Sequence, residues 1–164
     1  MSTKTTTTAP APAVAAEKVL AAKWGKTAIR AGFTALPDVI FKQPKALGLK
    51  RLDVLVILHL ASYWWKPNEL PRPAKATIAD ALDCDSRTVQ RSIEKMEKLG
   101  YIKRIGRMAK VGDNLPNQYD LRGLVKAIEK LAADELDKRE KRAAEDKART
   151  TSPKTFGLIK GGKE

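Results

Sequence analysis

Hydrophobic side chains recur at helical spacing in two short runs between residues 75 and 105, with a polar turn between them. The positions that we expect to face inward are Ile78, Ala79, Leu82, Cys84, Val89, Ile93 and Met96. Asp85 is a good N-cap, so the second helix is predicted to run from Ser86 to Leu99. Gly100 suits a left-handed C-cap because it has no Cβ, and a strand is expected to follow directly. The pattern predicts two helices joined by a tight turn, then a strand.

Another hydrophobic run precedes this pair of helices. Its members recur every three or four residues: Leu52, Val56, Ile57, Leu60 and Trp64. They predict a long helix from Lys50 to Trp65, which we expect to be the central packing element. The chain before it should be extended from about Ile29 to Leu36, with a short helix starting at Pro37. Three prolines should keep the chain after the long helix extended: Pro67, Pro71 and Pro73.

A β-ribbon and a further helix are expected after the first helix pair. The stretch from Ile105 to Asn117 is polar and contains glycine, which predicts a loop, and a second short strand should run from Gln118 to Leu121. The two strands would pair as a ribbon. Residues 122–149 then show a helical pattern, and its apolar stripe consists of Leu124, Ile128 and Leu131.

These elements predict a mainly α-helical (α+β) fold with one small β-ribbon. One compact domain would span residues 23–121, and a C-terminal helix would span residues 122–149. Residues 1–22 are rich in Thr, Ala and Pro, so we expect a disordered arm, with a weak helix over Ala15–Lys23 as the alternative. Residues 150–164 are expected to form a disordered tail.

The net charge of the chain indicates which class of partner it binds. The 164 residues carry a formal charge of +13 with a pI near 9.9, which implies an anionic partner, either nucleic acid or an acidic membrane surface. Between Ser86 and Gly112 there are eight cationic and two anionic side chains. A membrane-surface helix would need a broad apolar face opposite its cations, and no basic stretch has one. We therefore expect nucleic acid and no membrane contact.

Candidate chemistry other than charge is sparse. Cys84 is the only cysteine, which excludes an internal disulfide and a cysteine cluster for zinc and fits a reducing cytoplasm. No secretory signal is recognisable, and the longest apolar stretch, residues 52–65, is too short to cross about 30 Å of hydrocarbon. No nucleophile, general base and oxyanion donor stand out as a set. We expect no enzyme activity, no cofactor and no metal.

Several separated motifs then coincide: KWG, GFTALP, ALGL, HLASYWW, LPRPAKATIADAL, SRTVQRSIEKMEKLGYIKR and NQYDLRGLV. Over roughly residues 23–130 they resemble a family of bacterial, plasmid and phage winged helix-turn-helix proteins, some of them transcriptional regulators and others related to replication initiators. The resemblance implies duplex DNA binding, with Ser86, Arg87, Gln90 and Arg91 at the positions that touch bases and phosphates. Two positions depart from the family pattern. Ala74 stands where relatives often have a capping Ser, and Asp83 stands where many have Gly.

The candidate DNA-contacting residues lie on the second helix and on the ribbon: Ser86, Arg87, Thr88, Gln90, Arg91, Glu94, Lys95, Arg104, Arg107 and Lys110. Arginine can pair in two-pronged fashion with guanine O6 and N7 or with a phosphate, and glutamine can read adenine. Thr88 would hold a phosphate or the helix start, and Glu94 would accept from cytosine or neutralise nearby cations. The alternatives are a solvated cationic helix face and a ribbon of loose cations instead of minor-groove contacts.

The sequence thus favours a sequence-specific double-stranded DNA-binding protein, a transcriptional repressor of a mobile genetic element that is nucleoid- or plasmid-associated in the bacterial cytoplasm. We expect a homodimer formed through Leu124, Ile128 and Leu131, with packing of this stripe onto its own domain as the alternative. A second hypothesis is a replication-initiation or partition factor that binds origin repeats and recruits a replication or transcription protein through the tail. A third is a protein-binding module whose basic face docks an acidic partner.

Overall fold

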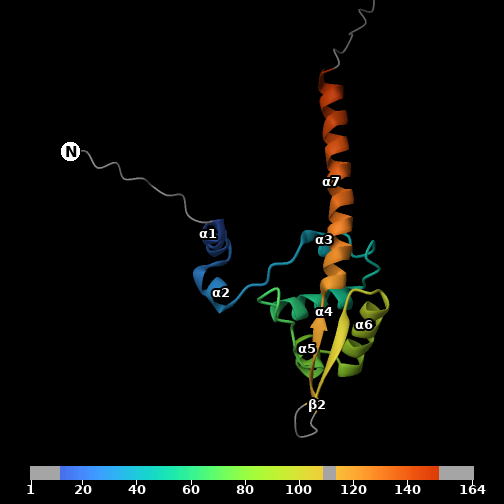
Figure 1. The fold of residues 1–164 in the computed structure, drawn as a ribbon. Coiled ribbons are helices and arrows are strands. Elements are labelled where there is room, and N and C mark those ends of the chain that lie inside the picture. Colours follow the sequence, from blue (N-terminus) through green and yellow to red (C-terminus); the bar gives the residue numbers. More distant parts are fainter. Residues whose placement is uncertain (1–11, 109–113, 152–164) are drawn as a thin grey trace, which may run out of the picture.

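The computed structural model of the chain describes residues 12–108 and 114–151. Figure 1 shows a small helical domain with a two-stranded ribbon on one side and a long helix leaving from the other. In chain order the elements are α1 (Pro12–Trp24), α2 (Lys26–Ala31), α3 (Asp38–Lys42), α4 (Arg51–Ser62), α5 (Lys75–Ala81), α6 (Ser86–Lys98), β1 (Lys103–Met108), β2 (Asn114–Asp120) and α7 (Arg122–Thr151). The mainly α-helical fold with one small β-ribbon is confirmed.

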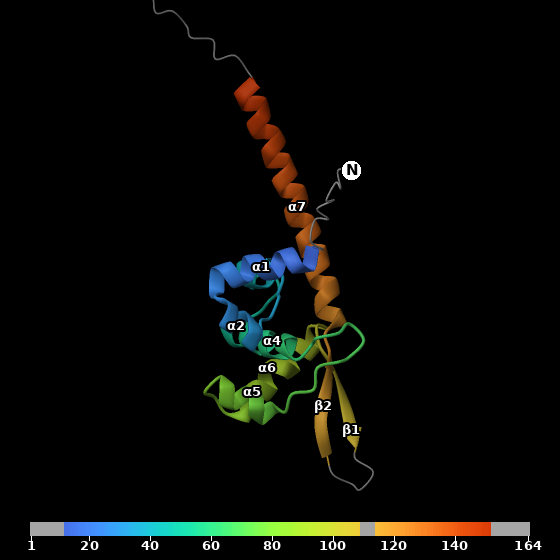
Figure 2. The ribbon, with the colours of Figure 1, turned by 90° about the vertical axis from the view of Figure 1, so that its left-hand side faces the viewer.

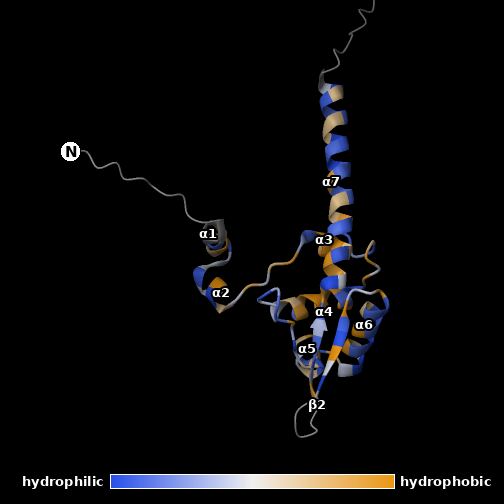
Figure 3. Cartoon of the chain, viewed as in Figure 1, coloured by the Kyte–Doolittle hydropathy of each residue, from blue (hydrophilic) through white to orange (hydrophobic). Residues whose placement is uncertain are grey.

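Helices α4, α5 and α6 enclose the core of the domain. Their core side chains are each 2% exposed or less: Val56, Ile57, Leu60, Ile78, Ala79, Val89, Ile93 and Met96. Leu82 and Cys84 pack partly buried against them, so every inward position predicted for α5 and α6 lies in or against the core. Figure 3 shows that apolar segments concentrate in α4 and at the base of α7, where the two helices meet the core.

Helix α4 ends at Ser62 and not at the predicted Trp65. Tyr63 occupies the C-cap at φ −97° and ψ 0°, so the last predicted turn is not helical. Pro67 lies just beyond, in a turn in which the Glu69 N–H donates to the carbonyl of Lys66 at 3.1 Å, so the chain at Pro67 is not extended as predicted. The apolar spacing continued to Trp64 because this side chain still packs, partly buried, against the core from outside the helix.

The turn between α5 and α6 explains one of the departures from the family pattern. Asp83 adopts φ +49°, and among the described residues no other non-glycine residue has a positive φ. Aspartate tolerates this left-handed conformation better than most residues because its short polar side chain hydrogen-bonds locally. Asp83 therefore serves where a glycine would be expected. Ala74, the second departure, is the N-cap of α5 and makes no side-chain capping bond.

The C-terminus of α6 is closed as predicted. Gly100 has φ +74°, and its N–H donates to the carbonyl of Glu97 at 2.9 Å, while the N–H of Tyr101 donates to the carbonyl of Met96 at 2.9 Å. These two bonds form a Schellman motif. Ile102, which is 3% exposed, covers the last turn. The chain consequently leaves α6 in a fixed direction and enters β1.

Strands β1 and β2 form an antiparallel ribbon, here called the wing, which extends away from the helices (Figure 2). Arg107 pairs with Leu115, so much of the stretch from Ile105 to Asn117, predicted as a loop, is strand. The sequence did not reveal this because a ribbon with a solvated face can be built from polar residues. The N–H of Tyr119 donates to the carbonyl of Pro71 at 2.9 Å and ties the proline-rich segment to the wing.

Helix α7 begins against the end of α6. The N–H of Leu124 donates to the carbonyl of Tyr101 at 2.9 Å. At Gly123 the backbones approach so closely that a Cβ would lie 1.9 Å from the carbonyl oxygen of Gly100. Only glycine permits this approach. The ends of α6 and α7 are therefore joined through backbone atoms.

The apolar stripe at the start of α7 packs onto its own domain. Leu124 is 3% exposed and Ile128 is 8% exposed, and Leu131 packs against the same core. This corrects the expectation of a dimer face on these three residues, because the domain that they stabilise already covers them. From Leu136 to residue 150 every side chain is exposed, and Figure 3 shows this part of α7 as mainly hydrophilic.

The N-terminal region differs from the expected arm. Helix α1 begins at Pro12, so the boundary at residue 22 was placed too late, and the weak-helix alternative comes closer to the structure. Helix α2 runs to Ala31, where extended chain was expected from Ile29. Alanine and lysine favour helix, and the only interruption is Gly25 at φ +88°. Residues 1–11 and 152–164, and with them most of the predicted tail, lie outside the described residues.

Replacement of Gly123 by alanine should destabilise the domain. Alanine favours a helix over glycine by about 0.5–1 kcal/mol, but the clash with the Gly100 carbonyl should cost about 1–3 kcal/mol and prevail. Urea unfolding followed by circular dichroism would measure the change. Gly106→Ala is the matched control, because a Cβ at Gly106 meets nothing within 4 Å. Equal stability of the two variants would refute the close helix contact.

Candidate nucleic-acid interface

The start of α6 is fixed by its predicted N-cap. The carboxylate of Asp85 accepts from the Thr88 N–H at 3.0 Å and from the Thr88 hydroxyl at 2.9 Å. These hydrogen bonds hold the pKa of the Asp85 carboxyl below its ordinary value. Of the two roles expected for Thr88, the structure shows the contact at the helix start.

An exposed polar row follows directly on α6. Ser86, Arg87 and Arg91 are exposed, while the opposite face of the helix, with Val89 and Ile93, is fully buried. Within the described part of the chain, neither guanidinium has an acidic partner or a hydrogen bond. The two arginines lie one helical turn apart on one face, so both are available to a partner outside the protein.

Gln90 and Glu94 lie on the same helix but are already engaged. The Lys75 ammonium donates to Gln90 Oε1 at 2.7 Å, and Gln90 Nε2 donates to Glu94 Oε1 at 2.8 Å. Glu94 therefore accepts from a neighbouring side chain in this structure. Lys75 belongs to α5, and residue spacing could not predict its contact with Gln90 because the two side chains lie on different helices.

Lys95 belongs to a buried cluster between α4 and α6. Asp53, which is 3% exposed, accepts from Lys95 Nζ at 2.5 Å, from the Ser92 hydroxyl at 2.6 Å and from the Lys50 N–H at 2.7 Å. Burial alone would raise the pKa of the Asp53 carboxyl, but the hydrogen bonds from Lys95, Ser92 and Lys50 outweigh it and lower the pKa. The Lys95 ammonium thus holds α6 to α4.

The predicted cations of the wing divide into paired and unpaired ones. Arg104 Nη2 lies 2.9 Å from Glu97 Oε2, and the Arg104 N–H donates to Glu97 Oε1 at 3.1 Å. Arg104 thereby fastens the base of the wing to α6. Arg107 is partly buried and has no ionic partner among the residues that the structure describes. Lys110 lies outside the described residues.

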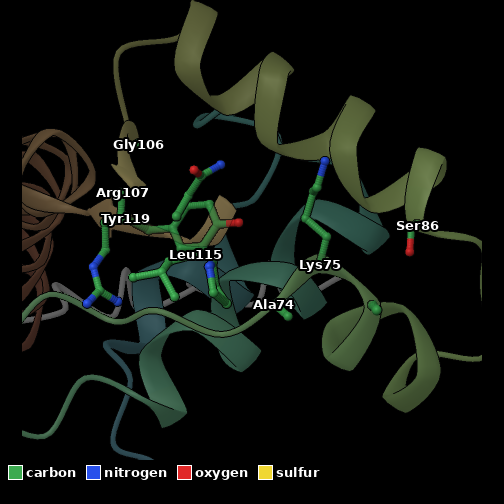
Figure 4. Close-up of a pocket in the computed structure, with 10 residues that line it drawn as sticks. Ala74, Lys75, Ser86, Gly106, Arg107, Leu115 and Tyr119 are labelled. Carbon is green, nitrogen blue, oxygen red and sulfur yellow. The ribbon is translucent and has the colours of Figure 1, made fainter. Parts of the chain in front are cut away.

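A cleft of about 780 Å³ separates the two helices of the motif from the wing. Figure 4 shows Lys75 and Ser86 on the helix side, Arg107 and Leu115 on the wing side, and the ring of Tyr119 between them. Burial raises the pKa of the Tyr119 phenol above its ordinary value. The cleft extends from Ser86, the first residue of the exposed row on α6, to Arg107, and its cationic side chains are Lys75 and Arg107.

Residues 12–108 and 114–151 contain no group of three or more His, Cys, Asp or Glu side chains placed to hold a metal ion. Nor does that part of the chain contain a helix of the length and apolarity required to span a membrane.

The fold is that of a winged helix-turn-helix protein. Helices α5 and α6 cross, α6 carries the exposed polar row, and the wing lies beside them. Residues 47–102, from Leu47 to Ile102, match the family model described as a helix-turn-helix domain. The match covers α4, α5 and α6 and ends just before the wing. It supports DNA binding by this part of the chain.

Solved structures that are similar to the chain include the following two. One is titled a "possible transcriptional regulator" from Methanosarcina mazei Go1, with 24% identity, a TM-score of 0.38, and coverage of 64% of this chain and 85% of that chain. The other is titled transcriptional regulator PA3341, with 24% identity, a TM-score of 0.38, and coverage of 71% of this chain and 75% of that chain. No curated protein matches the chain.

Asp53→Ala should destabilise the protein by about 2–4 kcal/mol at pH 7, because it removes a buried acceptor that satisfies three donors. The folded pKa of Asp53 is lowered, so this stabilisation is complete above the unfolded pKa of about 3.9 and is lost as pH falls through the folded value. Chemical unfolding at pH 7 and pH 3 should therefore show a smaller difference from the wild type at pH 3.

Asp38→Ala is the matched control for this substitution. Asp38 also pairs with a lysine, Lys42, but both side chains of that pair are largely exposed. An exposed ion pair contributes little to stability, so the control should unfold like the wild type. A wild-type-like Asp53→Ala variant would contradict the role given to the buried cluster.

Proposed function

We propose that this protein binds double-stranded DNA sequence-specifically, with α6 in the major groove. The observation that supports this proposal is the pair Arg87 and Arg91. Both are exposed and unpaired within the described residues, and they lie one turn apart on the N-terminal half of the second helix of the motif. In helix-turn-helix proteins this half of the helix reaches the base edges. Arginine there pairs with guanine O6 and N7.

The surfaces beside α6 suit the DNA backbone. Lys75 and Ser86 line one wall of the cleft and Arg107 lines the other, so a phosphate strand that follows α6 would pass between cationic and hydroxyl groups. Contacts to phosphates set register and carry no sequence information. We therefore assign Arg107 to the backbone and Arg87 and Arg91 to the bases. Release of counterions from the DNA would supply much of the affinity.

The biological role that we propose is a transcriptional repressor, which acts by occupying a promoter. The helix-turn-helix match supports a DNA-binding regulator, and the family resemblance adds a mobile genetic element as the setting. A homodimer would need a face other than the stripe of Leu124 and Ile128, which lies in the core. Selection of sites from a random duplex library would test whether the protein binds as a dimer, because paired half-sites indicate a twofold dimer and a single site indicates a monomer.

Arg87→Ala and Arg91→Ala should each weaken binding to the selected duplex by about 1–3 kcal/mol and relax the preference at one base pair. Each arginine supplies a two-pronged base contact that alanine cannot replace. Fluorescence anisotropy at a fixed salt concentration would measure the affinities. Arg142→Ala, at an exposed cation on the solvated part of α7, is the control and should bind like the wild type. The assignment fails if neither reading-helix variant loses affinity.

A further inference from the structure

Three side chains at the crossing of α5 and α6 form a hydrogen-bonded chain. Lys75 donates to Gln90 Oε1 at 2.7 Å, and Gln90 Nε2 donates to Glu94 Oε1 at 2.8 Å. All three side chains are partly buried, and Figure 4 shows Lys75 extending from α5 towards α6. The amide of Gln90 is therefore held at its oxygen by one helix and at its nitrogen by the next turn of its own helix.

The chemistry of the two neighbours fixes the orientation of this amide. An ammonium only donates hydrogen bonds, and an ionised carboxylate only accepts them. If the Gln90 amide were flipped, its NH₂ group would face the Lys75 donor and its oxygen would face the Glu94 acceptor. Both contacts would then be lost. Only one of the two amide orientations satisfies both partners.

The amide keeps enough hydrogen-bonding capacity to contact a base. A primary amide has two N–H donors and two acceptor lone pairs, and the chain uses one of each. One donor and one acceptor remain. Adenine presents the complementary pair in the major groove, with N7 as acceptor and the N6 amino group as donor.

We propose that Gln90 selects adenine at one base pair of the DNA site, and that Lys75 and Glu94 are positioning residues that sharpen this selection without touching the base. The inference rests on the proposed function. A free glutamine can rotate its amide and meet several base edges, whereas a held amide presents a single polarity. Sequence preference would then depend on Lys75, a residue of α5 and not of the reading helix.

Lys75 has a simpler alternative role, as a cation that contacts a phosphate from the wall of the cleft. The two roles have different consequences. Loss of a phosphate contact weakens binding to every sequence alike and lowers the slope of log affinity against log salt by about 0.9. Loss of a positioning contact instead reduces the preference among the four base pairs at one position.

The experiment measures dissociation constants for four duplexes that differ only at the base pair assigned to Gln90. That base pair is the one whose preference disappears in Gln90→Ala during site selection. The wild type should prefer adenine there by roughly 5- to 150-fold. Lys75→Met and Glu94→Ala should each reduce this preference several-fold. Lys75→Arg, which keeps a donor, and Glu94→Gln, which keeps an acceptor, should retain most of it.

Thermal unfolding of each variant separates a local effect from a loss of fold, and Glu94→Ala tests the chain from the end opposite to Lys75. The inference is overturned if Lys75→Met and Glu94→Ala leave the size of the preference for adenine unchanged, or if the preferred base pair at Gln90 is not adenine. A wild-type protein without any preference among duplexes would instead refute the proposed function. A preference confined to the positions of Arg87 and Arg91 would refute this inference alone.

Discussion

The buried carboxylate of Asp53 determines how α6 is held in the domain. It receives hydrogen bonds from the start of its own helix, α4, and from Ser92 and Lys95 of α6. A carboxylate so deeply buried is tolerated only because each of these donors compensates its lost hydration. Since Arg87 and Arg91 project from the far side of α6, the angle at which they leave the domain follows from this contact. The Schellman motif at Gly100 and the backbone contact with Gly123 fix the other end of the same helix.

The cationic side chains of the motif fall into two groups with different roles, and the net charge does not distinguish between them. Lys95, Arg104 and Lys75 direct their charges towards Asp53, Glu97 and Gln90 respectively, and so hold α4, the wing and α5 to α6. Arg87, Arg91 and Arg107 have no such partner within the described residues. The cations of the first group stabilise the packing of α6 against its neighbours, and those of the second group are available to bind a partner. Counting charges along the sequence therefore overestimates the number of side chains available to DNA.

The features that the sequence predicted are those encoded by neighbouring residues. The spacing of Val89, Ile93 and Met96, the N-cap at Asp85 and the C-cap at Gly100 are all local, and the structure has each of them. Contacts between distant residues were missed: Ser92 lies 39 positions from Asp53 and Gln90 lies 15 positions from Lys75. The prediction of a dimer face on Leu124, Ile128 and Leu131 was wrong for a related reason. An apolar helix face does not specify whether its own domain or another copy of the chain covers it.

The solvated part of α7 has a consequence for how the molecule moves. A helix of 30 residues is about 45 Å long, and only its first turns rest on the domain, which gives the particle an elongated outline. Translational friction grows with such elongation even when mass does not. A single copy will therefore elute early from a sizing column, and its apparent mass there will exceed the value from light scattering.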